Sequence, residues 1–300
     1  METVFFIALF GIGVAFGSFI NVLSLRYRPE RGVFTRASIG GRSRCDGCKR
    51  TLKWYELIPL LSFFVQKGRC KNCNKELTFQ YPIIELFSGI IVLGVPIFLN
   101  NFFSVSQTLF SNFLLSGWYY GIISLWVIVF LTFLLISLID MKHFIIPDEL
   151  SGFIGMCGII IIIIVSFHIN DLPQFSTSFV KNYSLLFSPF QNIFVNHIMG
   201  AVISGAFFLI LNILTKGRGM GFGDVKLAFV IGLLFGWADS ILIILLSFIV
   251  GGLWGLYLIF SKRKKMKDRV PFGPFLILGC LIVFLFGPLI LNGYFNLFGL

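Results

Sequence analysis

Two aspartates, Asp140 and Asp224, each lie where a long apolar run meets a basic loop. Asp140 closes the run 131–139, and Asp224 closes the glycine-rich stretch 219–223. A carboxylate at a membrane boundary is costly and is by default a functional-site hypothesis. Two such carboxyls can share one proton and activate a water molecule. A lone boundary aspartate is more often a helix cap, but the glycines before Asp224 favour the chemical interpretation.

The composition indicates a membrane protein. The chain is 57% hydrophobic and only 12% charged, and its mean hydropathy of +0.93 lies far outside the range of soluble domains. Several apolar runs approach the ~20 residues that a helix needs to cross a bilayer. We therefore expect an all-α polytopic fold, with the lipid bilayer as a partner. A net charge of +11 would suggest nucleic acid in a soluble protein, but here it belongs to loops, so no nucleic acid is expected.

Hydrophobic periodicity predicts about eight transmembrane helices. The sixth is the shortest, and a tight turn at 236–240 would connect it to the seventh. The predicted spans are 4–24, 82–99, 118–139, 150–167, 194–214, 225–236, 240–260 and 272–291.

The basic residues predict the orientation of these spans. Of 24 Lys and Arg, 13 lie in 26–80, one is Lys142, three lie in 216–226 and six in 262–269. With eight spans and an outside N-terminus, these segments share one face, which the positive-inside rule makes cytoplasmic. We therefore expect a multi-pass membrane protein with the 26–80 loop and both aspartates on the cytoplasmic side.

The 26–80 loop contains a predicted metal site. Cys45 and Cys48 form one CxxC pair, Cys70 and Cys73 form a second, and 21 residues separate the pairs. Two such knuckles can present four thiolates to a tetrahedral Zn²⁺, and a closed four-cysteine sphere is typical of a structural zinc ribbon. Disulfides are the alternative, and a cytoplasmic location argues against them.

Seven motifs in a fixed order resemble one known family. In chain order, they are Gly17-Ser18-Phe19-Ile20-Asn21-Val22 with Arg26; the two CxxC pairs; Lys53-Trp54-Tyr55-Glu56-Leu57-Ile58-Pro59, which lies between these pairs; Tyr81-Pro82-Ile83-Ile84-Glu85; Ile139-Asp140 through Ile146-Pro147-Asp148; Gly219 to Leu227; and Pro271-Phe272-Gly273-Pro274. Nearly the whole chain thus resembles the bacterial prepilin peptidases, bifunctional leader peptidases and N-methyltransferases of type IV pilus, type II secretion and competence systems. Its GxGD element also resembles that of intramembrane aspartyl proteases.

The resemblance implies that Asp140 and Asp224 cleave prepilins or pseudopilins between a basic leader and an apolar helix. One carboxyl would accept a proton from water while the other protonates the leaving amine, and because two close carboxylates cannot both ionise cheaply, one pKa should rise. Gly221 and Gly223 would let the backbone approach the substrate and adopt positive φ. Two further residues, Lys226 and Asp148, could bind substrate or support the site, and Asp148 is favoured as a helix cap. Residues 101–300 would form this peptidase domain.

The methyltransferase half follows from the resemblance alone, because no strand–GxGxxG–helix unit for S-adenosylmethionine is present. The resemblance implies S-adenosylmethionine as a cofactor and a methylation region at 1–100 that includes the zinc loop. The associated residues, for each of which structural support is as plausible as direct contact, are Gly17, Asn21, Arg26, Trp54, Tyr55 and Glu85.

Three other hypotheses remain open from the sequence. A non-enzymatic scaffold with a zinc-ribbon docking loop would leave both aspartates without a chemical role, which their GxGD context argues against. A transporter would carry its charged groups near the bilayer midplane, with broken helices, whereas Asp140 and Asp224 lie at one interface. A peptidase that does not methylate is the nearest alternative within the enzymes.

Overall fold

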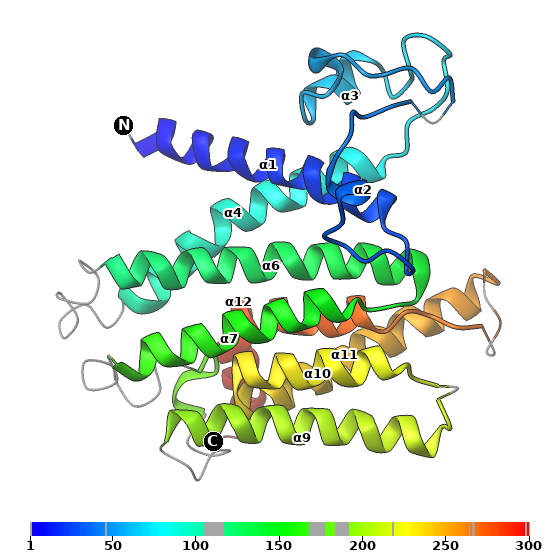
Figure 1. Cartoon of the computed structure of the whole chain (residues 1–300). Helices are drawn as coiled ribbons and strands as arrows, with labels where there is room; N and C mark the ends of the chain where they lie inside the picture. Colours follow the sequence, from blue (N-terminus) through cyan, green and yellow to red (C-terminus); the bar gives the residue numbers. More distant parts are fainter. Residues whose placement is uncertain are drawn as a thin grey trace. The chain divides into compact units, whose positions relative to one another are not determined.

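The computed structural model describes residues 2–45, 47–104, 117–167, 178–183, 192–217, 219–263, 265, 268–297 and 299. These residues are mostly helical, and the only β-type pairing among them is two isolated bridges. The helices, labelled in Figure 1, are α1 (Glu2–Arg26), α2 (Arg36–Ile39), η1 (Trp54–Glu56), α3 (Leu61–Val65), α4 (Gln80–Ser104), α6 (Gly117–His143), α7 (Asp148–Phe167), η3 (Lys181–Tyr183), α9 (Ile193–Leu214), α10 (Phe222–Phe235), α11 (Trp237–Phe260) and α12 (Gly273–Leu297).

Every predicted span carries a helix, but they are not equal in length. Among the described residues, seven helices are long and apolar enough to cross a membrane, and α10 is not one of them. Its 14 residues extend about 21 Å, which is short of a hydrocarbon core of about 30 Å. A single residue, Gly236, separates the end of α10 from the start of α11. Its φ of +82° allows the chain to change direction there. The all-α polytopic prediction is confirmed, with a sixth helix that is shorter than a full span.

The chain divides into two compact units, Met1–Phe102 with Trp126–Leu138 and Phe103–Leu125 with Ile139–Leu300. In the first unit, α1 and α4 cross closely. An added Cβ at Gly17 would lie 1.9 Å from Ser88 Oγ, and one at Gly13 would lie 2.7 Å from the Ser88 carbonyl oxygen. Small residues at such crossings allow two membrane helices to approach closely. The segment between α1 and α4 forms the cysteine loop.

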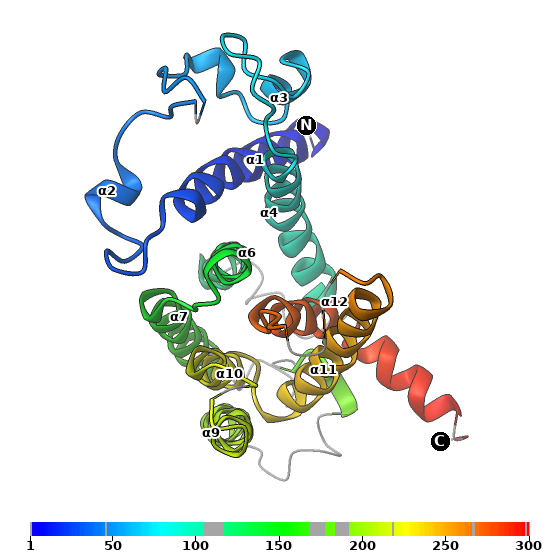
Figure 2. The same ribbon diagram turned by 90° about the vertical axis from the view of Figure 1, so that its right-hand side faces the viewer.

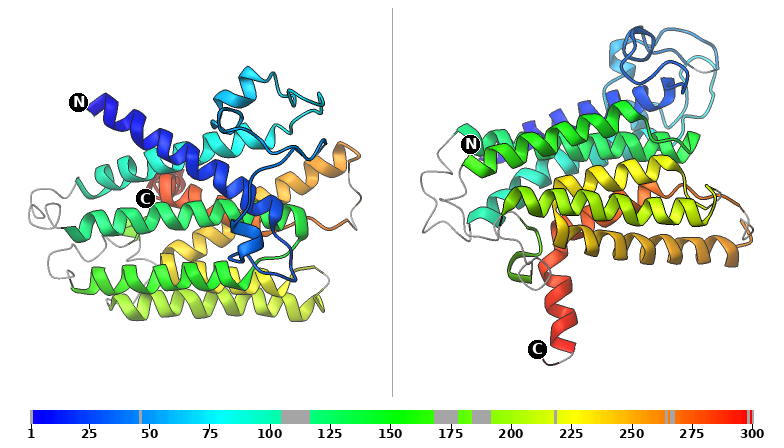
Figure 3. Two further views of the ribbon diagram at one scale, coloured as in Figure 1. Left: turned by 45° about the horizontal axis from the view of Figure 1, so that its top comes forward. Right: turned by 60° about the horizontal axis from the view of Figure 1, so that its bottom comes forward.

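In the second unit, α10 lies between α7 and α9, and α11 lies beside α12 (Figure 2). The contact between α9 and α10 is backbone against backbone, because a Cβ at Gly232 would lie 2.2 Å from the Gly200 carbonyl oxygen. Pro288 lies inside α12, and the C-terminal part of that helix turns away from its first part (Figure 3). A proline removes one helical hydrogen bond and clashes with the preceding turn, which explains the bend.

A buried carboxylate ties one connecting segment to this unit. Asp239, in the first turn of α11, is fully buried and accepts hydrogen bonds from Ser178 Oγ and from the N–H groups of Phe179 and Val180, all at 3.0 Å. The Phe179 ring also packs on Phe284, with centroids 4.7 Å apart. The segment between the predicted spans 150–167 and 194–214 is thus anchored at 178–183, and residues 168–177 and 184–191 lie outside the described residues.

Candidate active site

Asp140 lies in the last turn of α6, and its side chain is buried. Its Oδ2 accepts a hydrogen bond of 3.1 Å from the backbone N–H of Gly273, the first residue of α12. A Cβ added at Gly273 would lie 2.7 Å from the same oxygen. Only glycine therefore allows the α12 backbone to approach this carboxyl so closely.

Asp224 is the third residue of α10 and is also buried. Its Oδ2 accepts a 3.1 Å hydrogen bond from the N–H of Gly221, the residue that precedes the helix. An acidic side chain at this position commonly satisfies a free N–H at a helix start. Asn212 of α9 holds the preceding loop, because its Nδ2 donates to the Met220 carbonyl oxygen at 2.6 Å.

The second unit brings the two carboxyls into one neighbourhood, since they are close enough to interact electrostatically. Ile146 contributes the apolar side of that neighbourhood. A Cβ at Gly223 would lie 3.2 Å from Ile146 Cβ, and one at Gly273 would lie 3.4 Å from Ile146 Cδ1. Two buried carboxyls, each held through one oxygen by a backbone N–H, have the donor and acceptor capacity to move protons to and from a bound water.

The two glycines of the GxGD element differ from expectation. Neither Gly221 nor Gly223 has a positive φ, so that part of the prediction is wrong. Gly221 sits at φ −76° because it starts α10 and donates to Asp224. Gly223 is needed for space, since its added Cβ would press on Ile146. The close approach that these glycines permit is, in the described residues, to the protein's own Asp224 and Ile146.

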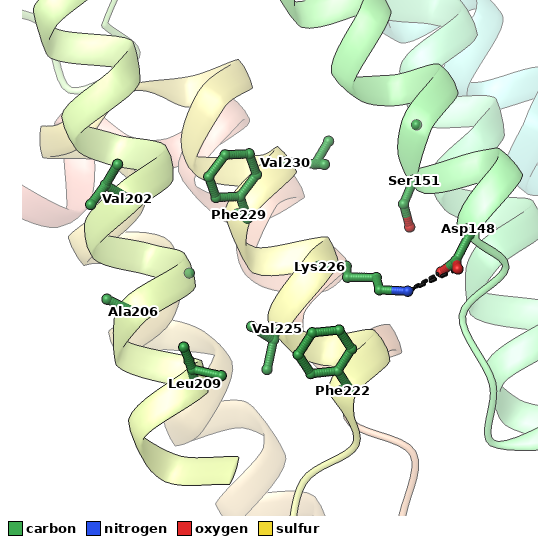
Figure 4. Close-up of a pocket in the computed structure, with 12 residues that line it drawn as sticks. Asp148, Ser151, Val202, Ala206, Leu209, Phe222, Val225, Lys226, Phe229 and Val230 are labelled. Atoms are coloured by element: carbon green, nitrogen blue, oxygen red, sulfur yellow. Dashed lines mark hydrogen bonds and ion pairs between the residues drawn. The ribbon is translucent and has the colours of Figure 1, made fainter. Parts of the chain in front are cut away.

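Lys226 and Asp148 form an ion pair between α10 and α7. Lys226 Nζ lies 2.7 and 2.8 Å from the two Asp148 carboxylate oxygens. Among the described residues, this carboxylate accepts no hydrogen bond from the N–H groups at the start of α7. The side chain predicted to cap α7 instead pairs with Lys226. The pair closes one end of an apolar cavity of about 670 Å³ between α7 and α9, floored by α10 residues such as Val225 and Phe229 (Figure 4).

In the first unit, four cysteine sulfurs form a cluster. The Sγ atoms of Cys45, Cys48, Cys70 and Cys73 all lie within 4.8 Å of one another, and none is in a disulfide. The two knuckles repeat one geometry. Cys45 N–H donates to the Arg50 carbonyl and Cys70 N–H to the Lys75 carbonyl, each at 2.9 Å. Lys49 and Asn74, at equivalent places, both have positive φ.

This donor set fits Zn²⁺, which takes four thiolates at tetrahedral corners. The backbone N–H groups of Asn72 and Cys73 lower the pKa of the Cys70 thiol to about 6. Desolvation and the other three thiols of the cluster act in the opposite direction on Cys73 and raise its pKa to about 11, and thiolate is the form that binds metal. Beside the cluster, Glu56 is held by Arg50 at 2.6 Å and by the Lys53 N–H at 2.8 Å.

The residues that the resemblance associates with methylation fall in two places of the first unit. Three of them meet at the α1–α4 crossing. Gly17 packs on the Glu85 backbone, Glu85 Oε2 accepts from the Leu60 N–H at 2.7 Å, and Asn21 Oδ1 accepts from Gln80 Nε2 at 3.1 Å. Asn21 is fully buried, and its Nδ2 has no hydrogen-bond partner among the described residues.

The other three lie toward the loop. The Arg26 guanidinium donates to the Gly40 carbonyl oxygen and more weakly to those of Ser38, Gly41 and Arg42, so it holds the loop beside α2. The rings of Trp54 and Tyr55 in η1 are both exposed and meet edge to face, with centroids 5.9 Å apart.

Comparison with known proteins places the chain. Residues 126–256 match the model of the type IV leader peptidase family, and residues 12–99 match the bacterial peptidase A24 N-terminal domain. The chain belongs to the type IV leader peptidase family. This is a family of aspartic peptidases, so the chain is an enzyme.

Relatives match along most of their length and carry one name, prepilin leader peptidase/N-methyltransferase. The relative from Bacillus subtilis is 28% identical over 96% of this chain and 97% of its own length. The relative from Pseudomonas aeruginosa is 26% identical over 96% and 92%. The relative from Aeromonas salmonicida is 27% identical over 85% and 75%. No solved structure matches the chain.

Two residues of this candidate site were not predicted as site residues from the sequence. Gly273 belongs to the motif Pro271-Phe272-Gly273-Pro274, but the sequence alone does not show that this glycine contacts Asp140. Ile146 closes the apolar run Phe144-Ile145-Ile146, where nothing in the sequence distinguishes it from its apolar neighbours. Both act through proximity in space to residues distant in sequence.

Proposed function

We propose that this protein removes the basic leader from prepilins or pseudopilins and then methylates the new N-terminus. The observation that carries the peptidase half is the pair Asp140 and Asp224. Both are buried, both are oriented by a glycine N–H, and they lie close enough to interact. The family and the names of the relatives agree with this reaction.

In the proposed mechanism the pair holds one proton, because two neighbouring carboxylates repel each other. The ionised carboxyl accepts a proton from water as the water attacks the scissile carbonyl carbon. The protonated carboxyl donates to the departing amine, so that the C–N bond breaks and the pair recovers its starting state. Gly273 and Gly221 each fix one carboxyl oxygen and leave the other to face water and substrate. We place this site on the cytoplasmic side, from the positive charge of the loops.

We assign supporting roles to the residues around the pair. Gly223 makes room for Ile146, and Gly221 orients Asp224. Lys226 and Asp148 join α10 to α7 and so fix the start of α10. An Asp148 carboxylate that is already paired is better suited to support than to receiving a basic leader.

We assign the methylation half to residues 1–100. S-adenosylmethionine would supply the methyl group, and the relatives' names support its use. The buried Asn21 amide, which lacks a partner for Nδ2 among the described residues, is the polar group best suited to contact a ligand there. Zn²⁺ on the four cysteines would hold the loop, and Glu85 and Arg26 would fix the loop to α1 and α4.

The decisive test combines both reactions on one product. Purified protein, a prepilin and S-adenosylmethionine are incubated, and mass spectrometry reads the mature N-terminus. Wild type should release a methylated pilin. Cys70→Ser, which removes a thiolate, and Glu85→Gln should release mature pilin that stays unmethylated, with zinc content measured in parallel.

Parallel loss of cleavage and methylation in both variants, at normal membrane levels, would show that the loop is a shared support and would refute two separate sites. Wild type that cleaves without methylating would be a peptidase only. Wild type that neither cleaves nor methylates any prepilin would refute the proposed substrate and both proposed reactions.

A further inference from the structure

Helix α3 carries large apolar side chains on the outside of the cysteine loop. Leu61, Phe64 and Val65 are 64%, 68% and 69% exposed, and their spacing of three and four residues places them on one face. Phe63, between them, is 8% exposed. Contiguous exposed apolar side chains usually mark a surface that meets a partner or a membrane.

Two contacts fix the level of α3 along the membrane-spanning helix α4. The Leu60 N–H, at the start of α3, donates to Glu85, which lies five residues after Gln80, about 7 Å along the α4 axis. The Phe63 ring contacts the ring of Phe79, the residue before α4, with centroids 5.3 Å apart. Helix α3 therefore lies beside the first turns of a membrane span rather than beyond its end, as Figures 1 and 3 show.

Cationic side chains border the same face. A cavity of about 720 Å³ is lined by Phe64 and by Phe79, which is 71% exposed, and by Lys67 and Arg69. Glu76 also lines it and pairs with Arg69 at 3.1 Å, and because both side chains of this pair are exposed, Arg69 can exchange Glu76 for a lipid phosphate. The whole segment 26–80 holds 13 Lys and Arg against four Asp and Glu. Apolar side chains next to cations, at the level where a span begins, match the polarity change of a bilayer surface with anionic headgroups.

We propose that the α3 face, defined as Leu61, Phe64 and Val65 with Phe79, inserts into the headgroup region of the bilayer. Lys67 and Arg69 then hold anionic phospholipid headgroups at the edge of the inserted patch. Aromatic residues favour this interfacial zone, and each basic residue near the surface adds attraction for anionic lipid. The cysteine loop is thereby pinned against the membrane beside α1 and α4.

The test uses full-length, zinc-loaded protein in nanodiscs of phosphatidylcholine with a minor fraction of phosphatidylglycerol. A photoreactive phenylalanine analogue replaces Phe64 or, as the matched control, its buried neighbour Phe63. A third position, Leu86, is 45% exposed on α4 and reports lipid within the span. After illumination, mass spectrometry identifies what is attached to each position.

We expect lipid adducts at positions 64 and 86 and none at 63. At 64, phosphatidylglycerol should be enriched at least about two-fold over its share of the lipid, and Lys67→Gln with Arg69→Gln should abolish that enrichment. Lipid adducts at 86 combined with protein adducts or no adducts at 64 would overturn the proposal. Adducts at 64 in which phosphatidylglycerol only matches its bulk share would overturn the assignment of the two cations.

Discussion

The buried carboxyls of the two units are held in opposite ways. In the first unit, Glu56 has an ion pair and a backbone donor, and Glu85 is tied to the start of α3. In the second unit, Asp140 and Asp224 each have a single recorded hydrogen bond, through one oxygen, and they face each other's charge. A buried charge is tolerated when partners satisfy it. We therefore infer that Glu56 and Glu85, which hold loops, have a structural role. Asp140 and Asp224, which have fewer hydrogen bonds than their oxygens can accept, remain available for chemistry.

Asp239 shows that this difference does not simply follow the boundary between the units. It belongs to the second unit, yet three donors saturate it. Asp224 lies near the start of α10, and Asp239 lies beyond the other end of that helix. A helix of this length separates the two residues by about 20 Å. The number of partners, rather than burial or location in the bundle, separates the proposed catalytic pair from Asp239 and Glu56, whereas Glu85 has a single backbone hydrogen bond like Asp140 and Asp224.

The largest expected effect is the loss of either member of the pair. Asp140→Asn and Asp224→Asn keep the side-chain size but remove the acid–base function, which is worth about 10²–10⁴-fold or more in rate. Prepilin cleavage by purified, correctly inserted variants should become undetectable or nearly so. Because Asn also relieves the repulsion between the two carboxyls, thermal stability should be unchanged or slightly higher. If a variant still cleaves at a tenth of the wild-type rate, the substituted aspartate is not one of the two acid–base residues.

Gly273→Ala tests the positioning of Asp140 by a residue that carries no chemistry. The new Cβ would lie 2.7 Å from Asp140 Oδ2, so the carboxyl must move. A shift of about 1 Å at a reacting group can cost on the order of 10²-fold in rate. We expect kcat for cleavage to fall by roughly 10–100-fold with little change in KM.

Gly252→Ala on α11 is the matched control, since an added Cβ there meets nothing within 4 Å. Equal activity of the Gly273 and Gly252 variants would show that the contact between Gly273 and Asp140 does not matter for the reaction.

Asp239→Asn should separate stability from activity within the second unit. Asparagine replaces one of the two acceptor oxygens by an NH2 donor, which would face the N–H of Phe179 in the place of Oδ2 or the N–H of Val180 in the place of Oδ1. Breaking a buried, charged hydrogen-bond network costs about 2–4 kcal/mol. The melting temperature in detergent should fall by several degrees, while cleavage below the transition stays within about two-fold of wild type. A variant with normal stability but lost cleavage would mean that Asp239 takes part in the reaction.

The sequence predicts the helices well because length and hydropathy decide whether a segment spans a membrane. All eight predicted segments are helical, and the four cysteines converge as their spacing predicts. It predicts less where a residue acts across the fold. Gly223 and Gly273 are required by their close contacts with Ile146 and Asp140. Asp148 pairs with Lys226 rather than capping the start of its own helix. No local pattern encodes these pairings. The positive φ expected of Gly221 failed for a local reason, because this glycine starts α10 in an extended conformation and donates to Asp224.

The smallest expected effect is a pH dependence in the cysteine loop. The Lys53 N–H and the Arg50 guanidinium lower the pKa of Glu56. A carboxyl whose pKa is lower in the folded state stabilises the fold above its unfolded pKa of about 4.3, and this stabilisation is lost as the pH falls through the folded pKa.

Chelator-driven zinc release from wild type and Glu56→Gln measures this contribution. Glu56→Gln should release zinc faster at pH 7, and the two rates should converge as the pH falls through the lowered folded-state pKa of Glu56, below which both side chains are neutral. Protonation of the cysteine thiolates accelerates release in both proteins alike, so the ratio of the rates isolates Glu56. A ratio that stays constant from pH 7 to the acid limit would show that the charge of Glu56 does not hold the loop. Its role would then be limited to hydrogen bonds that glutamine can also make.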